Sequence, residues 1–332
     1  MSSPSGPFAN LAGVARRIDR WPVWALLFPR PKSGGDRLSL SKKIVVFGAV
    51  TALAYLACYF YRPGGMIGFD WIHFWSKSYI PSYYPPWTAW FLPLTGWNIL
   101  IGISISGFAV LVAIRSSHLT SSILSFFCLP FFWVLLTGQI DGLATSGLVG
   151  LPLTIPLALI KPQLLVFALF SKRSYFIFVI VFLFITFTIF GFWPNSIMSM
   201  GSYQLLNRAE QNIGLGGWWT LLALVGLWFS RGDMDMMMLS GAVAVPYLIP
   251  YHLFPTVPAV SRLRPWAALV AALTSWLPLS ANWIGPAGWW LGWIYVAWVW
   301  GNLAVERYAD APVIQHVHQL FSKQIKWKPT AQ

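Results

Sequence analysis

Long uncharged stretches are the feature of this sequence that most restricts the folds it can adopt. Apolar segments recur along most of the chain, and several approach the roughly 20 residues that a helix needs to cross a bilayer. Charged residues make up only 9% of the chain, whereas a typical soluble domain has about 25%. We therefore expect an all-α fold: a polytopic, multi-pass transmembrane helical bundle in the cell membrane.

The apolar segments predict about eight to ten spans. They lie at about 43–61, 97–114, 121–137, 175–193, 218–229, 236–254, 265–280 and 287–303. The stretch 142–170 is interrupted by glycine and proline, so it is either one kinked span or two short ones. A broken helix at membrane depth must line a cavity or pack against protein.

Basic residues set the expected orientation of the chain. Eight Lys or Arg residues precede the first predicted span, and the formal net charge is +13. Positive charge of this kind marks the cytoplasmic side and contact with anionic lipid, so we expect membrane lipids and no nucleic acid as partners. Three regions result: a cytoplasmic basic N-terminal segment (1–42), a transmembrane domain (43–305) with outer loops at 62–96 and 194–217, and a polar C-terminal tail (306–332).

Four groups of polar side chains interrupt the apolar pattern. They are Asp70 with His73, Gln139 with Asp141, Lys161 alone, and Tyr251 with His252. Polar groups near a bilayer are costly and are usually paired or functional. Each group also has a structural alternative: Asp70 could cap a helix or pair with Lys77, Gln139 and Asp141 could end a span, Lys161 could extend to the interface, and His252 could be a packing histidine.

Short motifs around these residues follow one another in a defined order. They are Phe69-Asp70-Trp71-Ile72-His73, Tyr84-Pro85-Pro86, Leu92-Pro93, Gly138-Gln139, Leu159-Ile160-Lys161-Pro162, and Pro246-Tyr247 with Tyr251-His252 before Pro255. In this order the chain resembles the GT-C superfamily of membrane glycosyltransferases, in particular the glycosyltransferase 87 (DUF2029) group, which is polyprenyl-phosphate-mannose-dependent and mannosyltransferase-like. The chain departs from the pattern in lacking a second acidic residue beside Asp70.

The resemblance implies a GT-C-like bundle that transfers a hexose, with mannose expected, from a polyprenyl-phosphate sugar to a lipid or glycan acceptor. Asp70 would deprotonate the acceptor hydroxyl, and positive charge would stabilise the departing phosphate. By the same resemblance, Lys161, Arg208 or His252 would meet the phosphate, while His73, Tyr84 and Gln139 would bind sugar hydroxyls. The lipid-linked donor takes the place of a cofactor. The superfamily also admits a divalent metal, but the sequence offers no ligand set for one.

Two alternatives remain open at the level of the sequence. One is a non-catalytic membrane scaffold subunit of a larger complex that keeps the GT-C-like fold. The other is a secondary transporter, which the small number of charges within the spans and the lack of an internal repeat disfavour.

Overall fold

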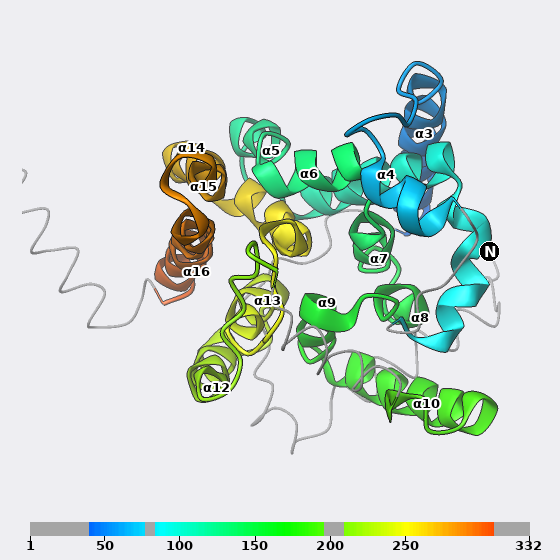
Figure 1. Ribbon diagram of the computed structural model, residues 1–332. Coiled ribbons are helices and arrows are strands. Elements are labelled where there is room, and N and C mark those ends of the chain that lie inside the picture. The colour runs from blue at the N-terminus through cyan, green and yellow to red at the C-terminus, as the bar shows by residue number, and fades with distance from the viewer. Residues whose placement is uncertain (1–39, 77–83, 196–208, 309–332) are drawn as a thin grey trace, which may run out of the picture.

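A computed structural model describes residues 40–76, 84–195 and 209–308, and this part of the chain is helical (Figure 1). The α-helices are α3 (Leu40–Ala57), α4 (Trp97–Arg115), α5 (Leu119–Ser125), α6 (Leu129–Thr137), α7 (Asp141–Ser146), α8 (Ile155–Ala158), α9 (Pro162–Leu169), α10 (Arg173–Phe190), α12 (Trp219–Ser230), α13 (Met234–Ala242), α14 (Pro265–Thr274), α15 (Ala281–Ile284) and α16 (Gly292–Arg307). A π-helical turn, η1 (Trp71–Trp75), and four 3₁₀ segments, η2 (Pro86–Thr95), η3 (Pro250–Arg262), η4 (Leu277–Ser280) and η5 (Pro286–Leu291), complete them. The β pairing within this part is one isolated bridge, Gly64 to Ile67, so the all-α prediction is confirmed.

Three described segments are long and apolar enough to cross a membrane: Trp97–Arg115, Arg173–Phe190 and Pro265–Ile284. A fourth results if α5 and α6, which meet at a bend of 43°, form one span. The outer surfaces suit contact with lipid, because large apolar side chains such as Phe184 on α10 and Trp228 on α12 are exposed. The total of eight to ten spans stays a prediction.

Proline determines where the expected spans are interrupted. The expected span 121–137 divides into α5 and α6 at Cys128, just before Pro130, and the backbone N–H of Leu129 instead donates to Ser275 Oγ at 2.9 Å. The expected continuous span 236–254 is wrong. There α13 ends at Ala242, and the buried 3₁₀ segment η3 begins at Pro250 and contains Pro255 and Pro258, because proline removes the N–H that an α-helix needs.

Helices α4 and α7 approach each other closely through small residues. A Cβ atom on Gly107 of α4 would collide with Ser146 of α7, and a Cβ atom on Gly142 of α7 would collide with Ser104 of α4. Reciprocal small residues of this kind let two helix backbones come together where no larger side chain fits. This contact holds α7, whose first residue is Asp141, against the long helix α4.

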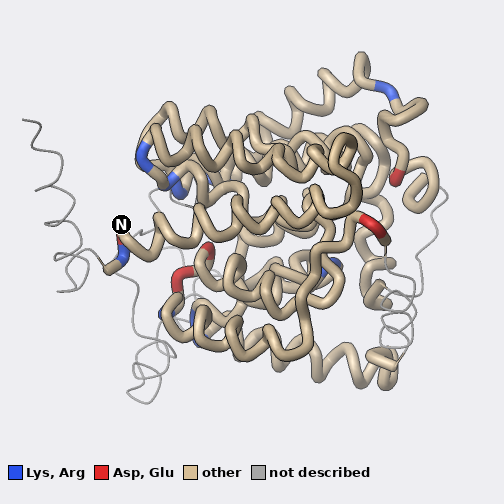
Figure 2. The backbone as a smooth tube through the Cα atoms, turned by 60° about the vertical axis from the view of Figure 1, so that its left-hand side comes forward, with Lys and Arg blue, Asp and Glu red and all other residues tan. Residues whose placement is uncertain are grey.

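Charged residues gather towards two ends of the bundle, with a long uncharged stretch between them (Figure 2). Helix α4 runs between these ends over about 28 Å, at 1.5 Å per residue. At its first residue, the Trp97 ring lies 5.7 Å from the ring of Trp71, the neighbour of Asp70. At its last residue, Arg115 forms an ion pair with Asp235 at 2.8 Å. The loop that carries Asp70 and the ion pair of Arg115 with Asp235 therefore lie at opposite ends of the bundle.

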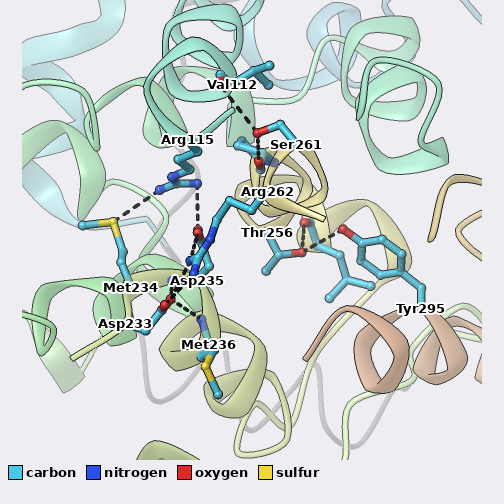
Figure 3. Close-up of polar contacts among 12 residues, drawn as sticks. Val112, Arg115, Asp233, Met234, Asp235, Met236, Thr256, Ser261, Arg262 and Tyr295 are labelled. Atoms are coloured by element: carbon cyan, nitrogen blue, oxygen red, sulfur yellow. Dashed lines mark hydrogen bonds and ion pairs between the residues drawn. The ribbon is translucent and has the colours of Figure 1, made fainter. Parts of the chain in front are cut away.

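The cluster at the Arg115 end is a buried network of ions (Figure 3). Arg262 of η3 binds Asp233 and Asp235, both at 2.9 Å, so that Asp235 is shared between Arg115 and Arg262. Asp233 also caps α13 by accepting backbone N–H bonds from Asp235 and Met236. The network therefore joins the end of α4, the start of α13 and the end of η3.

Candidate functional site

The loop that carries Asp70 is fixed to the end of α6 by its backbone. The N–H of Gly68 donates to the carbonyl of Leu136 at 2.6 Å. Gly138, which ends α6, has a φ of 72°, and a Cβ atom there would lie 2.7 Å from Trp71 and 2.8 Å from Trp97. Glycine is the residue that tolerates both the left-handed conformation and this close contact. The turn at Gly138 therefore brings the residue that follows it beside the Asp70 loop.

That following residue, Gln139, binds Asp70 directly. Its side-chain N–H donates to Asp70 Oδ2 at 2.5 Å, and Gln139 itself is buried. Burial raises the pKa of the Asp70 carboxyl above its usual value, while the hydrogen bonds of Thr137 and Gln139 and the charge of Lys161 act in the opposite direction. Within the described residues Asp70 forms no ion pair with a Lys or Arg, and Lys77 lies outside them.

Asp70 and Gln139 lie on the wall of a cavity of about 640 Å³. Its polar lining comprises Asp70, Tyr84, Thr137, Gln139, Lys161, Gln163, Gln211, Tyr247, Tyr251 and His252. Aromatic and apolar residues such as Phe74, Trp75 and Trp133 form the rest of the wall. Small-molecule sites usually have this size and this mixture of apolar surface with a few polar groups. The structure thus gathers five of the predicted site residues, Asp70, Tyr84, Gln139, Lys161 and His252, around one space.

Lys161 is the single Lys or Arg among the described residues of this wall. It precedes α9, and its Nζ forms an ion pair with Asp141 Oδ2 at 2.5 Å. The same Nζ lies over the Tyr251 ring, 5.1 Å from its centre, and forms a cation–π contact with it. Lys161 therefore does not extend to an interface, and Asp141 does more than end a helix: its carboxylate holds the ammonium group of Lys161.

His252 and Tyr84 complete the predicted set on the wall. The His252 ring is almost fully buried, at 3% exposed, and its Nδ1 accepts the backbone N–H of Ile249 at 3.0 Å. The Tyr84 ring lies 5.0 Å from that of Trp75 in an edge-to-face arrangement. Tyr84 reaches the cavity from just before η2, next to Pro85, and His252 reaches it from η3, which begins at Pro250.

Two predicted site residues are not brought to this cavity by the described structure. His73 Nδ1 lies 2.6 Å from the carbonyl of Phe69, its ring packs 4.3 Å from the Phe69 ring, and it is not part of the lining. Arg208 lies outside the described residues. Their predicted roles in ligand binding stay predictions.

Sequence reasoning missed several polar residues at or behind this wall as contributors to it, among them Thr137 beside Asp70. Gln163 and Gln211 line the cavity, and the Asp141 carboxylate lies behind Lys161. Gln163 directly follows the predicted Lys161-Pro162 motif, so its position on the first turn of α9 was the available signal. No comparable signal marks the pairing of Asp141 with Lys161, which are 20 positions apart.

The chain matches no family model, no curated protein and no solved structure. Among the described residues, no group of three or more His, Cys, Asp or Glu side chains is placed to hold a metal ion together. The wall offers one carboxylate that is not ion-paired within the described structure, one ammonium group held by a second carboxylate, and several neutral donors.

Proposed function

We propose that this protein is a membrane glycosyltransferase of the GT-C type. It transfers a hexose, with mannose the first candidate, from a polyprenyl-phosphate sugar to a hydroxyl group of a lipid or glycan acceptor, with inversion at the anomeric carbon. The observation that supports this most is the position of Asp70: its carboxylate, aligned by Gln139, faces a cavity whose wall also carries Lys161.

The proposed reaction assigns a separate task to each side of the cavity. The acceptor oxygen attacks the anomeric carbon while Asp70 takes its proton, and the bond from that carbon to the phosphate oxygen breaks. The phosphate leaves with the electron pair and meets the ammonium group of Lys161, which Asp141 holds in place. Because burial raises the pKa of Asp70, its carboxylate is a stronger base than an exposed aspartate would be.

The orientation of the chain supports access from the outer leaflet. Basic residues gather before and at the start of α3, and the Asp70 loop follows its end. With α3 as the predicted first span, the positive-inside rule favours a cavity on the side away from the cytoplasm. The predicted aromatic loop is part of the wall, with Phe74, Trp75 and Tyr84 beside the cavity. These side chains suit a ligand with a hydrocarbon chain attached to a polar head.

Replacing Asp70 by asparagine tests the proposal. Asn keeps the shape of the side chain but cannot accept the proton, so transfer of labelled mannose from polyprenyl-phosphate mannose should fall by about 10²- to 10⁴-fold. The assay uses protein in nanodiscs with a membrane-lipid extract as acceptor, and thermal unfolding verifies that the variant is folded. Other polyprenyl-phosphate hexoses are assayed in parallel.

Glu306→Gln is the matched control, because it makes the same acid-to-amide change at an exposed position on α16. It should transfer sugar at the wild-type rate. Transfer by Asp70→Asn at the wild-type rate would rule out Asp70 as the base. Absence of transfer by the wild type with every donor would favour the non-catalytic scaffold instead.

A further inference from the structure

The backbone fixes which nitrogen of the His252 ring carries a proton. The N–H of Ile249 donates to His252 Nδ1 at 3.0 Å in a buried hydrogen bond. A backbone amide can only donate, so Nδ1 must be unprotonated for this bond to exist. The ring hydrogen of a neutral histidine then lies on Nε2. The turn from Ile249 into η3, which Pro250 begins, holds the two groups together.

The opposite edge of the ring is left for a ligand. His252 lines the cavity although only 3% of it is exposed. Within the described residues the hydrogen bond of the ring is made by Nδ1 alone, and His252 lines the cavity, so Nε2 is the ring nitrogen left for a ligand there. A buried N–H without a partner is costly, and an acceptor from a ligand would satisfy it.

The surroundings of the ring oppose a second proton. Burial and the positive charge of Lys161 both disfavour an imidazolium ion. Protonation of Nδ1 would also break the bond from Ile249. The other titratable side chains of the wall are Asp70, Tyr84, Tyr247 and Tyr251, and the two last contact the ring at 5.9 Å and 4.4 Å between centres.

We propose that His252 is a positioning residue that stays neutral and donates its Nε2–H to a phosphoryl oxygen of the lipid-linked sugar phosphate. The proposal rests on the proposed function and changes what was expected of this histidine: it orients the phosphate through a hydrogen bond and carries no positive charge. Lys161 then provides the positive charge of the described wall, and His252 fixes the orientation of the phosphate relative to Asp70.

The first test reads the tautomer without any ligand. The protein is labelled with ¹⁵N-histidine, placed in nanodiscs and studied by NMR, with the His252 signals assigned from their loss in His252→Asn. We expect one protonated and one unprotonated ring nitrogen, unchanged from pH 5 to pH 8. An imidazolium at pH 6, or a proton on Nδ1, would overturn the inference and leave the proposed function standing.

The second test compares two variants that each keep one half of the ring's function. Asn places an oxygen near the position of Nδ1, so His252→Asn keeps the bond from Ile249 and loses the donor to the ligand. Gln places an N–H near the position of Nε2, so His252→Gln keeps the donor and loses the bond from Ile249. Farnesyl phosphate should bind His252→Asn about 10- to 100-fold more weakly than the wild type, as the loss of one hydrogen bond to a charged group predicts.

His252→Gln should bind farnesyl phosphate close to the wild-type affinity and unfold at a lower temperature. Methyl mannoside, used as a second probe, should bind all three proteins alike. Two results would overturn the assignment to phosphate. One is that His252→Asn binds the mannoside more weakly but farnesyl phosphate normally; the other is that His252→Asn and the wild type bind farnesyl phosphate equally well. If the wild type itself does not bind farnesyl phosphate, both this inference and the proposed donor are wrong.

Discussion

The hydrogen bond between Gln139 and Asp70 links the two residues on which the proposed chemistry most depends. An amide donor stabilises the ionised carboxylate and thereby lowers its pKa, against the stronger effect of burial, which raises it. A base must be deprotonated before it can act, so sugar transfer should be lost as the pH falls through the pKa of Asp70. The acid side of the pH profile therefore reports on the pKa of Asp70, to which this contact contributes.

Gln139→Leu should move the acid side of the kcat/KM profile to higher pH by about one unit, because a hydrogen bond to a charged group contributes about 1.5 kcal/mol or more. The measurement is the pH at half-maximal kcat/KM, whatever happens to the maximal rate. Gln163→Leu is the control, since it removes another amide from the cavity wall and leaves the bond between Gln139 and Asp70 in place. A profile unchanged by Gln139→Leu would contradict the assignment of its acid side to Asp70.

At the scale of helices, the close contact between α4 and α7 fixes the position of Asp141, the first residue of α7. Asp141 in turn holds Lys161 at the cavity through their ion pair. Gly142→Ala should lower the free energy of unfolding by about 1–3 kcal/mol, because the added methyl group collides with Ser104 and overpacks the contact. Unfolding in detergent, monitored by tryptophan fluorescence, measures the change.

Two further variants make this measurement specific. Ser104→Gly in the same chain should restore much of the lost stability by making room for the methyl group. Gly301→Ala on α16 adds a methyl group where no atom lies within 4 Å, and it should unfold like the wild type or later. If Gly142→Ala were as stable as Gly301→Ala, the two helices would not be in the contact described.

The same scale shows what the sequence could and could not predict. The span predicted at 97–114 is α4, Trp97–Arg115, because an unbroken apolar run without proline leaves a helix as its simplest structure. The span expected at 236–254 is wrong because hydropathy alone ignores Pro246, four residues after the end of α13 at Ala242, and the prolines from Pro250 onwards. Five of the predicted site residues line one cavity, and their roles stay predictions, whereas the ion pair of Lys161 with Asp141 depends on how α7 and α9 meet in space.

Across the whole molecule, the cavity and the ion network occupy opposite ends of the bundle and have different tasks. The network ties the ends of α4 and η3 to the start of α13, and η3 also carries His252 towards the cavity. Burial raises the pKa of Asp233, but Arg262, the backbone N–H of Met236 and Arg307 together more than offset this, so the net pKa lies below its ordinary value. The stabilisation that Asp233 contributes is thus present above about pH 4 and is lost as the pH falls through the lower pKa of the folded state.

Asp235→Asn tests whether the network holds the bundle together without taking part in ligand binding. Asp235 pairs with both Arg115 and Arg262, and its loss leaves two largely buried guanidinium groups with fewer partners. The free energy of unfolding should fall by about 3 kcal/mol, the lower end for a broken buried pair, because Arg262 is partly exposed and keeps Asp233. Glu306→Gln, the exposed control, should unfold like the wild type.

The folded fraction of Asp235→Asn should bind farnesyl phosphate as tightly as the wild type, since about 28 Å of α4 separates the network from the Asp70 loop. Weaker binding at unchanged stability would instead make the network part of the site.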